Sequence, residues 1–247
     1  MISPFRKIRK RMFTESRIAK YLLYALGEIV LVVIGILIAL QLNNLNDQRK
    51  SREVVRLYYE QLLQDLDSDY KFIKETTLHY DSNRVKLEQY KSSFKENDIP
   101  PIQLLGHIGE LSWLMRDIRF GSYTIGTLQN TGDIALIPPD IRERLIRFKT
   151  FQEQVVLSSS KNSDSVVEMA NYATRFFGGS DLVQRMQNQP RLLAYTFQEE
   201  RQIQILIALE AAQDRKELAE GINLEKFEVM LKDIEDLTGM INEELNK

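Results

Sequence analysis

Short runs of acidic, glycine and serine residues are the places where this sequence could carry chemistry. The run Asp65-x-Asp67-x-Asp69 has the carboxylate spacing with which a calcium-binding loop begins. No glycine follows at the turn position of such a loop, and the flanking Leu62, Leu66 and Ile73 have helical spacing. We therefore predict no metal site here and expect the aspartates to form a solvated acidic face of a helix.

Two further patterns lack the residue that their chemistry needs. Gly121 and Gly126 have the glycine spacing of a phosphate-binding loop, but Thr127 stands where lysine is required. Ser158 and Lys161 match the Ser-x-x-Lys pattern of some acyl-transfer enzymes, but the companion motifs are absent. We expect a turn at the first site and a polar loop at the second.

The sequence offers no clear catalytic, cofactor-binding or metal-binding set. Cysteine is absent, which excludes disulfides, a thiolate nucleophile and cysteine metal ligands. His79 and His107 are far apart in sequence and have no HExxH partner, so we expect each at the surface or at a boundary of the fold. Trp113 lies near an apolar face and is expected in the core. These observations predict a protein that is not an enzyme.

Glu28 is the most unusual residue because it lies inside an apolar run. It is the single charged residue of the segment 21–42. At about 1.5 Å per residue the run is roughly 33 Å long, enough to cross a hydrocarbon core of about 30 Å. A buried core helix and a cleaved signal peptide are the alternatives. The run is longer than a signal peptide's apolar core and lacks a small-x-small cleavage site, so we predict an uncleaved anchor.

The charge before the span predicts its orientation. Residues 1–28 carry a net charge of +5, and the rest of the chain carries −7. Because bases accumulate on the cytoplasmic side, we expect a cytoplasmic amino terminus and a carboxyl-terminal domain outside, periplasmic if the cell has an outer membrane. The arm also suits anionic lipid, whereas no helix-turn-helix supports nucleic-acid binding. The bases are Arg6, Lys7, Arg9, Lys10, Arg11, Arg17 and Lys20.

One face of the span combines the buried acid with small residues. Spacing of three and four residues places these side chains on one face: Ala25, Glu28, Val32, Gly35 and Ala39. Gly35 and Ala39 form a small-xxx-small pair that lets another helix approach closely. We expect a helix–helix contact with Glu28 protonated or paired. Proton conduction and snorkelling toward the headgroups, which Gly27 would ease, are the alternatives.

The rest of the sequence predicts helices only. A long helix after the span carries apolar residues every seven positions from Tyr59 to Phe94 and ends at residues 97–101. Companion positions Asp69, Thr76 and Asn83 make its middle polar. Further helices are expected over residues 104–118, 122–130, 138–157, 166–177, 190–221 and 224–245, with a turn at 131–133, a kink or loop at 158–165, and one β-like stretch at 134–137.

The predicted fold is therefore all-α, with a basic arm (1–20), a transmembrane helix (21–42) and an extracytoplasmic helical domain (43–247). The repeat of Ala25, Val32 and Ala39 differs in phase by one residue, about 100° of rotation, from that of Tyr59 and its successors. The two faces therefore cannot form one straight seam. We expect either a break at residues 43–46 or different partners for the two faces.

The segment 20–41 resembles the signature of a Bacteroidota family of membrane proteins of unknown function. In that family a basic arm precedes a Gly-Glu-containing span, an Asn-rich exit and a helical domain. The chain matches at residues 5–9 and at Asn43-Asn44, and departs at Leu45, where Trp is expected. A second similarity runs from Ser122-Tyr123 through Leu128, Gly132-Asp133 and residues 140–142. The resemblance implies an inner-membrane protein with an outside helical domain, and no activity.

The residues favour a single-pass scaffold over the other classes of function. We expect the protein to lie in the bilayer and to assemble with itself or with another membrane protein through the span and the outside bundle. The alternative is a sensory or regulatory input domain. Because the cytoplasmic arm before the span is too short for an output domain, such a sensor would need a separate signalling partner.

Overall fold

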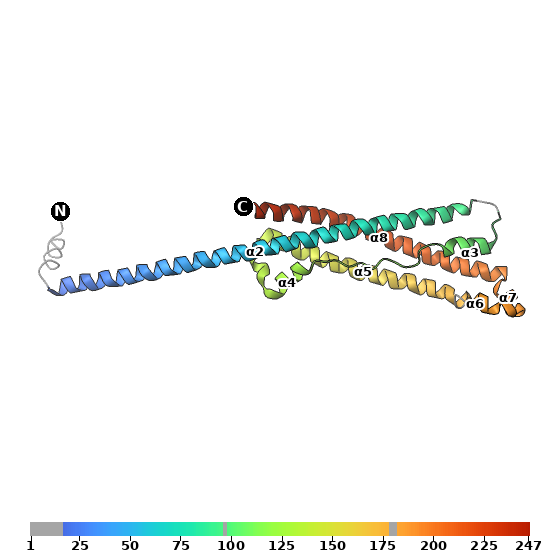
Figure 1. Cartoon of the computed structure of the whole chain (residues 1–247), viewed down its shortest axis with the longest axis horizontal. Helices are drawn as coiled ribbons and strands as arrows, with labels where there is room; N and C mark the ends of the chain where they lie inside the picture. Colours follow the sequence, from blue (N-terminus) through green and yellow to red (C-terminus); the bar gives the residue numbers. More distant parts are fainter. Residues whose placement is uncertain (1–16, 96–97, 178–181) are drawn as a thin grey trace, which may run out of the picture. The chain divides into compact units, whose positions relative to one another are not determined.

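The computed structural model describes residues 17–95, 98–177 and 182–247, and these residues form helices and no strand. The predicted all-α class is therefore confirmed (Figure 1). The α-helices are α2 (Arg17–Ser93), α3 (Pro101–Gly109), α4 (Tyr123–Thr131), α5 (Pro139–Phe177), α6 (Leu182–Arg185), α7 (Pro190–Thr196) and α8 (Glu199–Leu245). Two 3-10 turns, η1 (Asp133–Leu136) and η2 (Met186–Asn188), complete the set.

The chain divides into two compact units, Met1–Leu57 and Tyr58–Lys247. In the second unit the later part of α2 lies beside α5 and α8 (Figure 1). Helix α8 runs antiparallel to α2, since Tyr80 bonds Asn223 whereas Tyr90, further along α2, bonds the earlier Glu210. Helix α5 runs parallel to α2, since Gln152 bonds Asp69 whereas Ser159, further along α5, shares Asn223 with Tyr80, further along α2. The chain must therefore return along the bundle between α2 and α5, and we call residues 98–138 the return segment.

Each long helix buries one face that repeats every three and four residues. Full burial of one such side chain stabilises the folded state by roughly 1.5–3 kcal/mol. The buried faces of the long helices together form the core of the bundle. Phe94 is the exception to the predicted seam of α2, because 48 % of it is exposed just beyond the end of the helix. The apolar members are Tyr59, Leu62, Leu66, Ile73, Tyr80, Leu87 and Tyr90 in α2; Ile141, Leu145, Phe148, Val155 and Val166 in α5; and Phe227, Met230, Ile234, Leu237 and Ile241 in α8.

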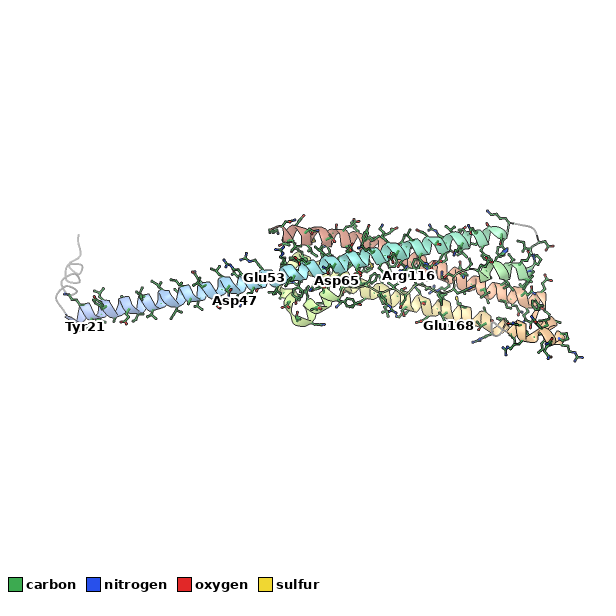
Figure 2. The ribbon with its side chains drawn as sticks, viewed as in Figure 1. Tyr21, Asp47, Glu53, Asp65, Arg116 and Glu168 are labelled. Carbon is green, nitrogen blue, oxygen red and sulfur yellow. The ribbon has the colours of Figure 1, made fainter. Side chains whose placement is uncertain are left out.

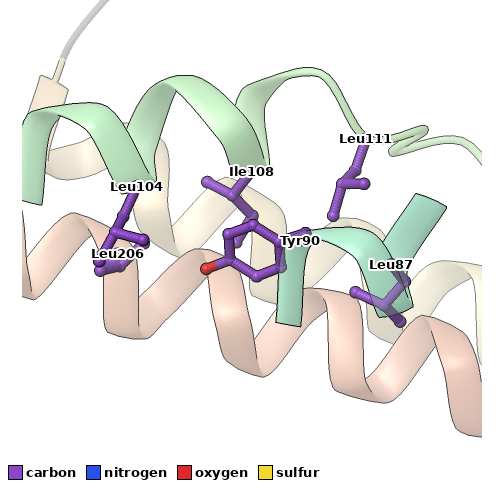
Figure 3. Packing of buried hydrophobic residues seen from close by; sticks show 6 residues of the cluster. All are labelled: Leu87, Tyr90, Leu104, Ile108, Leu111 and Leu206. Carbon is purple, nitrogen blue, oxygen red and sulfur yellow. The ribbon is translucent and has the colours of Figure 1, made fainter. Parts of the chain in front are cut away.

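The return segment is helical only at its two ends. Helix α3 packs Leu104 and Ile108 into a cluster with Leu111, Leu87 and other buried residues (Figure 3). Residues 112–122 form no helix, so the helix expected over 104–118 is wrong beyond Gly109. Length explains this: the segment leaves α2 at residue 87 and reaches it again at residue 69, about 27 Å away along the axis. A chain of about ten residues covers that distance when extended, at about 3.3 Å each, but not as a helix.

The second end of the return segment forms as expected. Helix α4 begins at Tyr123 and ends at Thr131, and the left-handed φ of 82° at the following Gly132 makes the predicted turn and suits glycine. The expected β-like stretch 134–137 lies instead in the 3-10 turn η1, except for its last residue. Helix α5 then opens at Pro139, as its sequence predicts.

Three expected breaks are absent because the helices continue through them. Helix α5 is unbroken across residues 158–165, and α8 is unbroken across Gly221. The helix expected from Pro190 is divided instead at Phe197 and Gln198, between α7 and α8. Helix α2 is also continuous through residues 43–46. The break expected there, as one explanation for the phase difference between the repeat of the span and the repeat that begins at Tyr59, is therefore wrong.

Candidate functional site

The proposed contact face of the span lies on α2 and is exposed along its whole length (Figure 2). Helix α2 is the one helix among the described residues that is long and apolar enough to cross a membrane. Helical spacing places five residues on one face. A Cβ added to Gly35 would meet no atom within 4 Å apart from its chain neighbours and the adjacent backbone of its own helix. The members are Ala25, Glu28, Val32, Gly35 and Ala39.

The bases that precede the span fall mostly outside the described residues. Lys20 is exposed on α2, and Arg17 is the first residue of that helix. The other five, Arg6, Lys7, Arg9, Lys10 and Arg11, lie outside the described residues. Their role in orientation and lipid contact stays a prediction.

The aspartates of the calcium-like run hold the return segment on α2. Asp65 accepts a hydrogen bond from the backbone N–H of Thr124 at 2.8 Å, and Asp69 accepts one from Gly121 at 2.6 Å. Asp69 also accepts from Ser122 Oγ at 2.8 Å and from Gln152 Nε2 at 2.6 Å. These carboxylates satisfy N–H groups at the start of α4 that have no partner within that helix.

The expected solvated acidic face is therefore wrong for Asp69, of which only 1 % is exposed. Burial raises the pKa of Asp69, and the hydrogen bonds from Gly121, Ser122 and Gln152 partly oppose that rise. Asp67, two residues earlier, is exposed and pairs with Lys71 at 2.6 Å, as a solvated face predicts. The geometry is that of a structural clamp.

A second polar clamp lies at the far end of α4. The Tyr58 hydroxyl donates to Asp133 Oδ2 at 2.7 Å, and Thr131 Oγ1 donates to the same oxygen at 2.9 Å. The hydrogen bond to Asp133 raises the pKa of Tyr58. Both ends of α4 are therefore fixed to α2, and Ser122 and Asp133, which make these contacts, belong to the second sequence similarity.

The remaining candidate patterns have structural places. Gly126 and Thr127 lie inside α4, so the turn expected between the glycines is confined to Gly121 and Ser122. Residues 158–161 lie inside α5 and not in a loop. His79 and His107 are exposed, as predicted, and Trp113 is partly buried against the cluster that includes Leu111.

Helix α8 buries a run of polar side chains that sequence analysis did not select. Its inward positions follow an unbroken spacing of three and four residues from Gln202 to Ile241. Four successive positions of that series are polar and buried: Gln213, Lys216, Glu220 and Asn223. A helix end at Gly221 would divide this series into two short parts, so the repeat can be recognised only if the helix continues through the glycine.

Three of these residues, Gln213, Lys216 and Glu220, border a cavity of about 230 Å³ between α2 and α8. Lys216 Nζ donates to Glu220 Oε1 at 2.7 Å, and Asn83 Nδ2 of α2 donates to the same oxygen at 3.1 Å. The side chains of Lys216 and Glu220 are only 4 % and 8 % exposed. Gln213 donates to the backbone carbonyl of Ser112 at 3.3 Å, which joins the return segment to the wall.

The fully buried side-chain amide of Asn223 joins α8 to both α2 and α5. Asn223 Nδ2 donates to Tyr80 Oη of α2 at 3.3 Å and to Ser159 Oγ of α5 at 3.1 Å. Its Oδ1 has no hydrogen-bond partner among the described residues, although it is buried. Burial raises the pKa of Tyr80 to about 12, so its hydroxyl remains protonated at physiological pH.

An apolar groove lies between the end of α5 and the start of α8. Its volume is about 570 Å³, and its wall includes Met169 and Tyr172 of α5 and Ile207 and Ala208 of α8. Tyr172 is 53 % exposed and Ile207 is 64 % exposed. The groove therefore presents apolar surface to solvent.

The fold defines a helical protein with one helix, among the described residues, that is long and apolar enough to cross a membrane. Residues 28–142 match the model of a family of unknown function, DUF6090, which supports a resemblance to a family without an assigned activity. The matched range contains the residues of the two clamps of α4 except Gln152, and α8 lies outside it. No curated protein and no solved structure matches the chain.

Proposed function

We propose that this protein is a membrane-anchored helical scaffold whose span joins a second copy of the chain or another membrane protein. The observation that carries the proposal is the contrast between two stretches of α2. From Tyr59 to Tyr90 the seam of α2 is buried against its own chain, whereas residues 21–42 are apolar and exposed. The bundle's seam thus has its partners, and the span's face is left for lipid or for another helix.

The contact face of the span suits close helix packing. Gly35 and Ala39 allow two backbones to approach, and Glu28 gains a hydrogen bond if a partner helix presents a polar group. The phase difference within α2 fits the second explanation from the sequence, namely that the two faces meet different partners. The groove beside Tyr172 and Ile207 is a further apolar surface for a partner outside the membrane.

The proposed location is the inner membrane, with the amino terminus cytoplasmic and the bundle periplasmic. The excess of bases before the span supports this orientation. The proposed role requires no reaction, cofactor, metal or nucleic acid.

Cross-linking in membranes tests the contact. Glu28→Gln is expected to retain most of the cross-linked product, since an amide can both donate and accept hydrogen bonds. Glu28→Leu is expected to weaken the contact by about 0.6–2 kcal/mol, the range of interhelical polar contacts. Gly35→Leu is expected to reduce the yield by steric exclusion. Gly27→Leu is the matched control, because Gly27 lies about 100° around the helix from Glu28.

Each outcome distinguishes one interpretation of Glu28. Wild-type yields in Glu28→Gln, Glu28→Leu and Gly35→Leu would overturn the contact and leave a Glu28 that snorkels. Equal loss of a cellular phenotype in Glu28→Gln and Glu28→Leu, with normal cross-linking, would indicate proton transfer instead, because an amide does not titrate.

A sensory input domain is the second candidate function. The polar cavity between α2 and α8 supports it, because a sensor needs a place for its ligand. In this role the domain would act on a separate signalling partner.

A further inference from the structure

The cavity beside Lys216 and Glu220 has features that packing alone does not explain. A buried ion pair is costly to desolvate, and apolar side chains at the same positions usually stabilise a helical core as well or better. Two successive inward positions of α8 nevertheless hold this pair. They lie at the edge of a cavity of about 230 Å³ instead of in a close-packed layer.

The cavity also presents hydrogen-bonding atoms that the described residues leave available. Both hydrogen bonds that the described residues make to Glu220 end on Oε1, from Lys216 and from Asn83. Lys216 Nζ carries three hydrogens, of which the bond to Glu220 uses one. Gln213 uses its Nε2 on the Ser112 carbonyl and keeps its Oε1 as an acceptor. The wall therefore offers donors and acceptors together.

The charge around the cavity is positive. Lys216 and Glu220 neutralise each other, and Glu217 on the wall is bonded to Lys91 at 2.7 Å. Arg84 and Lys86 of α2 add two positive charges to the wall. The local pair of Arg84 with Asp81, at 3.2 Å and well exposed, offsets only part of this charge.

We propose that this cavity binds a small carboxylate that carries an ammonium or hydroxyl group. The carboxylate faces Arg84 and Lys216, and the donor group faces Glu220 and Gln213. A dianion fits less well, because Glu220 would repel its second charge. At about 30 Å³ for each water-sized group, the volume admits roughly eight non-hydrogen atoms. This inference does not depend on contact between spans.

Thermal unfolding of the full-length protein in detergent tests the proposal. The probes are glycine, L-alanine, L-serine, L-threonine, glycolate and L-lactate, each at about 20 mM. Acetate lacks the donor group and ethanolamine lacks the carboxylate, so these two are the matched controls. At ten times its Kd, a binding probe is expected to raise Tm by about 3–6 °C, and the controls are expected to leave Tm unchanged.

Two variants locate the effect. Arg84→Gln removes a cation at the surface of the wall, and Glu220→Gln removes the buried charge at similar volume. Both are expected to lose at least tenfold in probe affinity, whereas Arg147→Gln, a surface arginine in a comparable local pair with Glu143, retains it. The proposal is overturned if none of the six probes shifts Tm, if a control probe shifts it equally, or if the shift survives in both variants.

Discussion

Asp69 shows how one buried carboxylate can fix a segment that is distant in sequence. It accepts from Gly121, Ser122 and Gln152, which come from two other parts of the chain. Removing the carboxylate leaves the buried Gln152 amide and the partly buried donors of Gly121 and Ser122 without this acceptor, and a fully buried donor without a partner costs about 1–3 kcal/mol. The residue therefore couples α2 to the start of α4 and to α5.

We expect Asp69→Ala to lower the free energy of unfolding by at least about 2 kcal/mol. The matched control is Asp67→Ala, which removes an exposed carboxylate paired with Lys71 and is expected to change stability by less than about 0.5 kcal/mol. Urea unfolding followed by circular dichroism measures both. Equal effects of the two substitutions would contradict the clamp.

The raised pKa of Asp69 predicts a pH dependence that Asp69→Asn removes. The native pKa lies above the ordinary value of 3.8, so the native state binds more protons than the unfolded state between these two values. The contribution of this group to stability is therefore full below the unfolded pKa and is lost as pH rises through the native pKa. Asparagine does not titrate.

The advantage in Tm of the wild type over Asp69→Asn is thus expected to shrink as pH rises from about 4 toward 7. Paired melting curves across this range measure the difference. An advantage that grows with pH would mean that the hydrogen bonds lower the pKa by more than burial raises it.

At the scale of single residues, the sequence predicts which side chains face inward but not which residues they contact. Asp69 belongs to the same three-four series as Leu66 and Ile73, so its inward position was visible. Its partners lie between 52 and 83 residues away. No local pattern contains such a contact, so the run resembled a solvated face.

At the scale of the helix, α8 shows why a glycine is a weak stop signal within a well-packed repeat. A glycine in a helix costs about 1 kcal/mol relative to alanine. The inward residues on both sides of Gly221, from Gln202 to Ile241, gain more than this by burial against neighbouring helices. The glycine predicts a helix end at Gly221, and the four polar positions from Gln213 to Asn223 offer no apolar repeat to oppose that prediction.

The buried pair of Lys216 and Glu220 in α8 predicts that substitutions of these two residues have non-additive effects on the free energy of unfolding. Lys216→Met leaves Glu220 buried with Asn83 as its remaining donor, and is expected to cost about 3 kcal/mol. Adding Glu220→Leu removes the unpaired charge, so the double variant is expected to be more stable than the single one. Denaturant unfolding of the wild type, Lys216→Met, Glu220→Leu and the double variant measures the coupling.

The exposed pair of Arg147 and Glu143 provides the comparison. Arg147→Met in this i, i+4 pair is expected to change stability by less than about 0.5 kcal/mol. A double variant in α8 that is less stable than Lys216→Met would show that Glu220 contributes through contacts other than its charge pair.

At the scale of the whole molecule, the sequence predicts the class of fold and the candidate membrane helix but not the arrangement of the helices. The all-α class and a helix able to cross a membrane follow from the long apolar run and the helical repeats. The order of α2, α5 and α8 does not, because it depends on a return segment whose extended form is set by the distance it must cover. The cavity between α2 and α8 depends on the same order of helices, so it cannot be predicted from the sequence either.

The proposed orientation predicts that the two ends of the chain lie on opposite sides of the membrane. The chain has no cysteine, so a single Lys247→Cys substitution creates the only thiol. Lys247 is exposed at the end of the bundle and its local pair with Glu244 lies at the surface, so the substitution leaves the fold intact. With the bases at the amino terminus held in the cytoplasm, this thiol lies outside the inner membrane.

A membrane-impermeant thiol reagent is therefore expected to label Lys247→Cys in cells whose outer membrane has been permeabilised. Ser3→Cys, within the basic arm, is the matched variant and is expected to be labelled only after the inner membrane is opened. The reverse pattern would invert the topology and place the cavity and the bundle in the cytoplasm. Labelling of both thiols in intact spheroplasts would mean that the apolar segment of α2 does not cross the membrane.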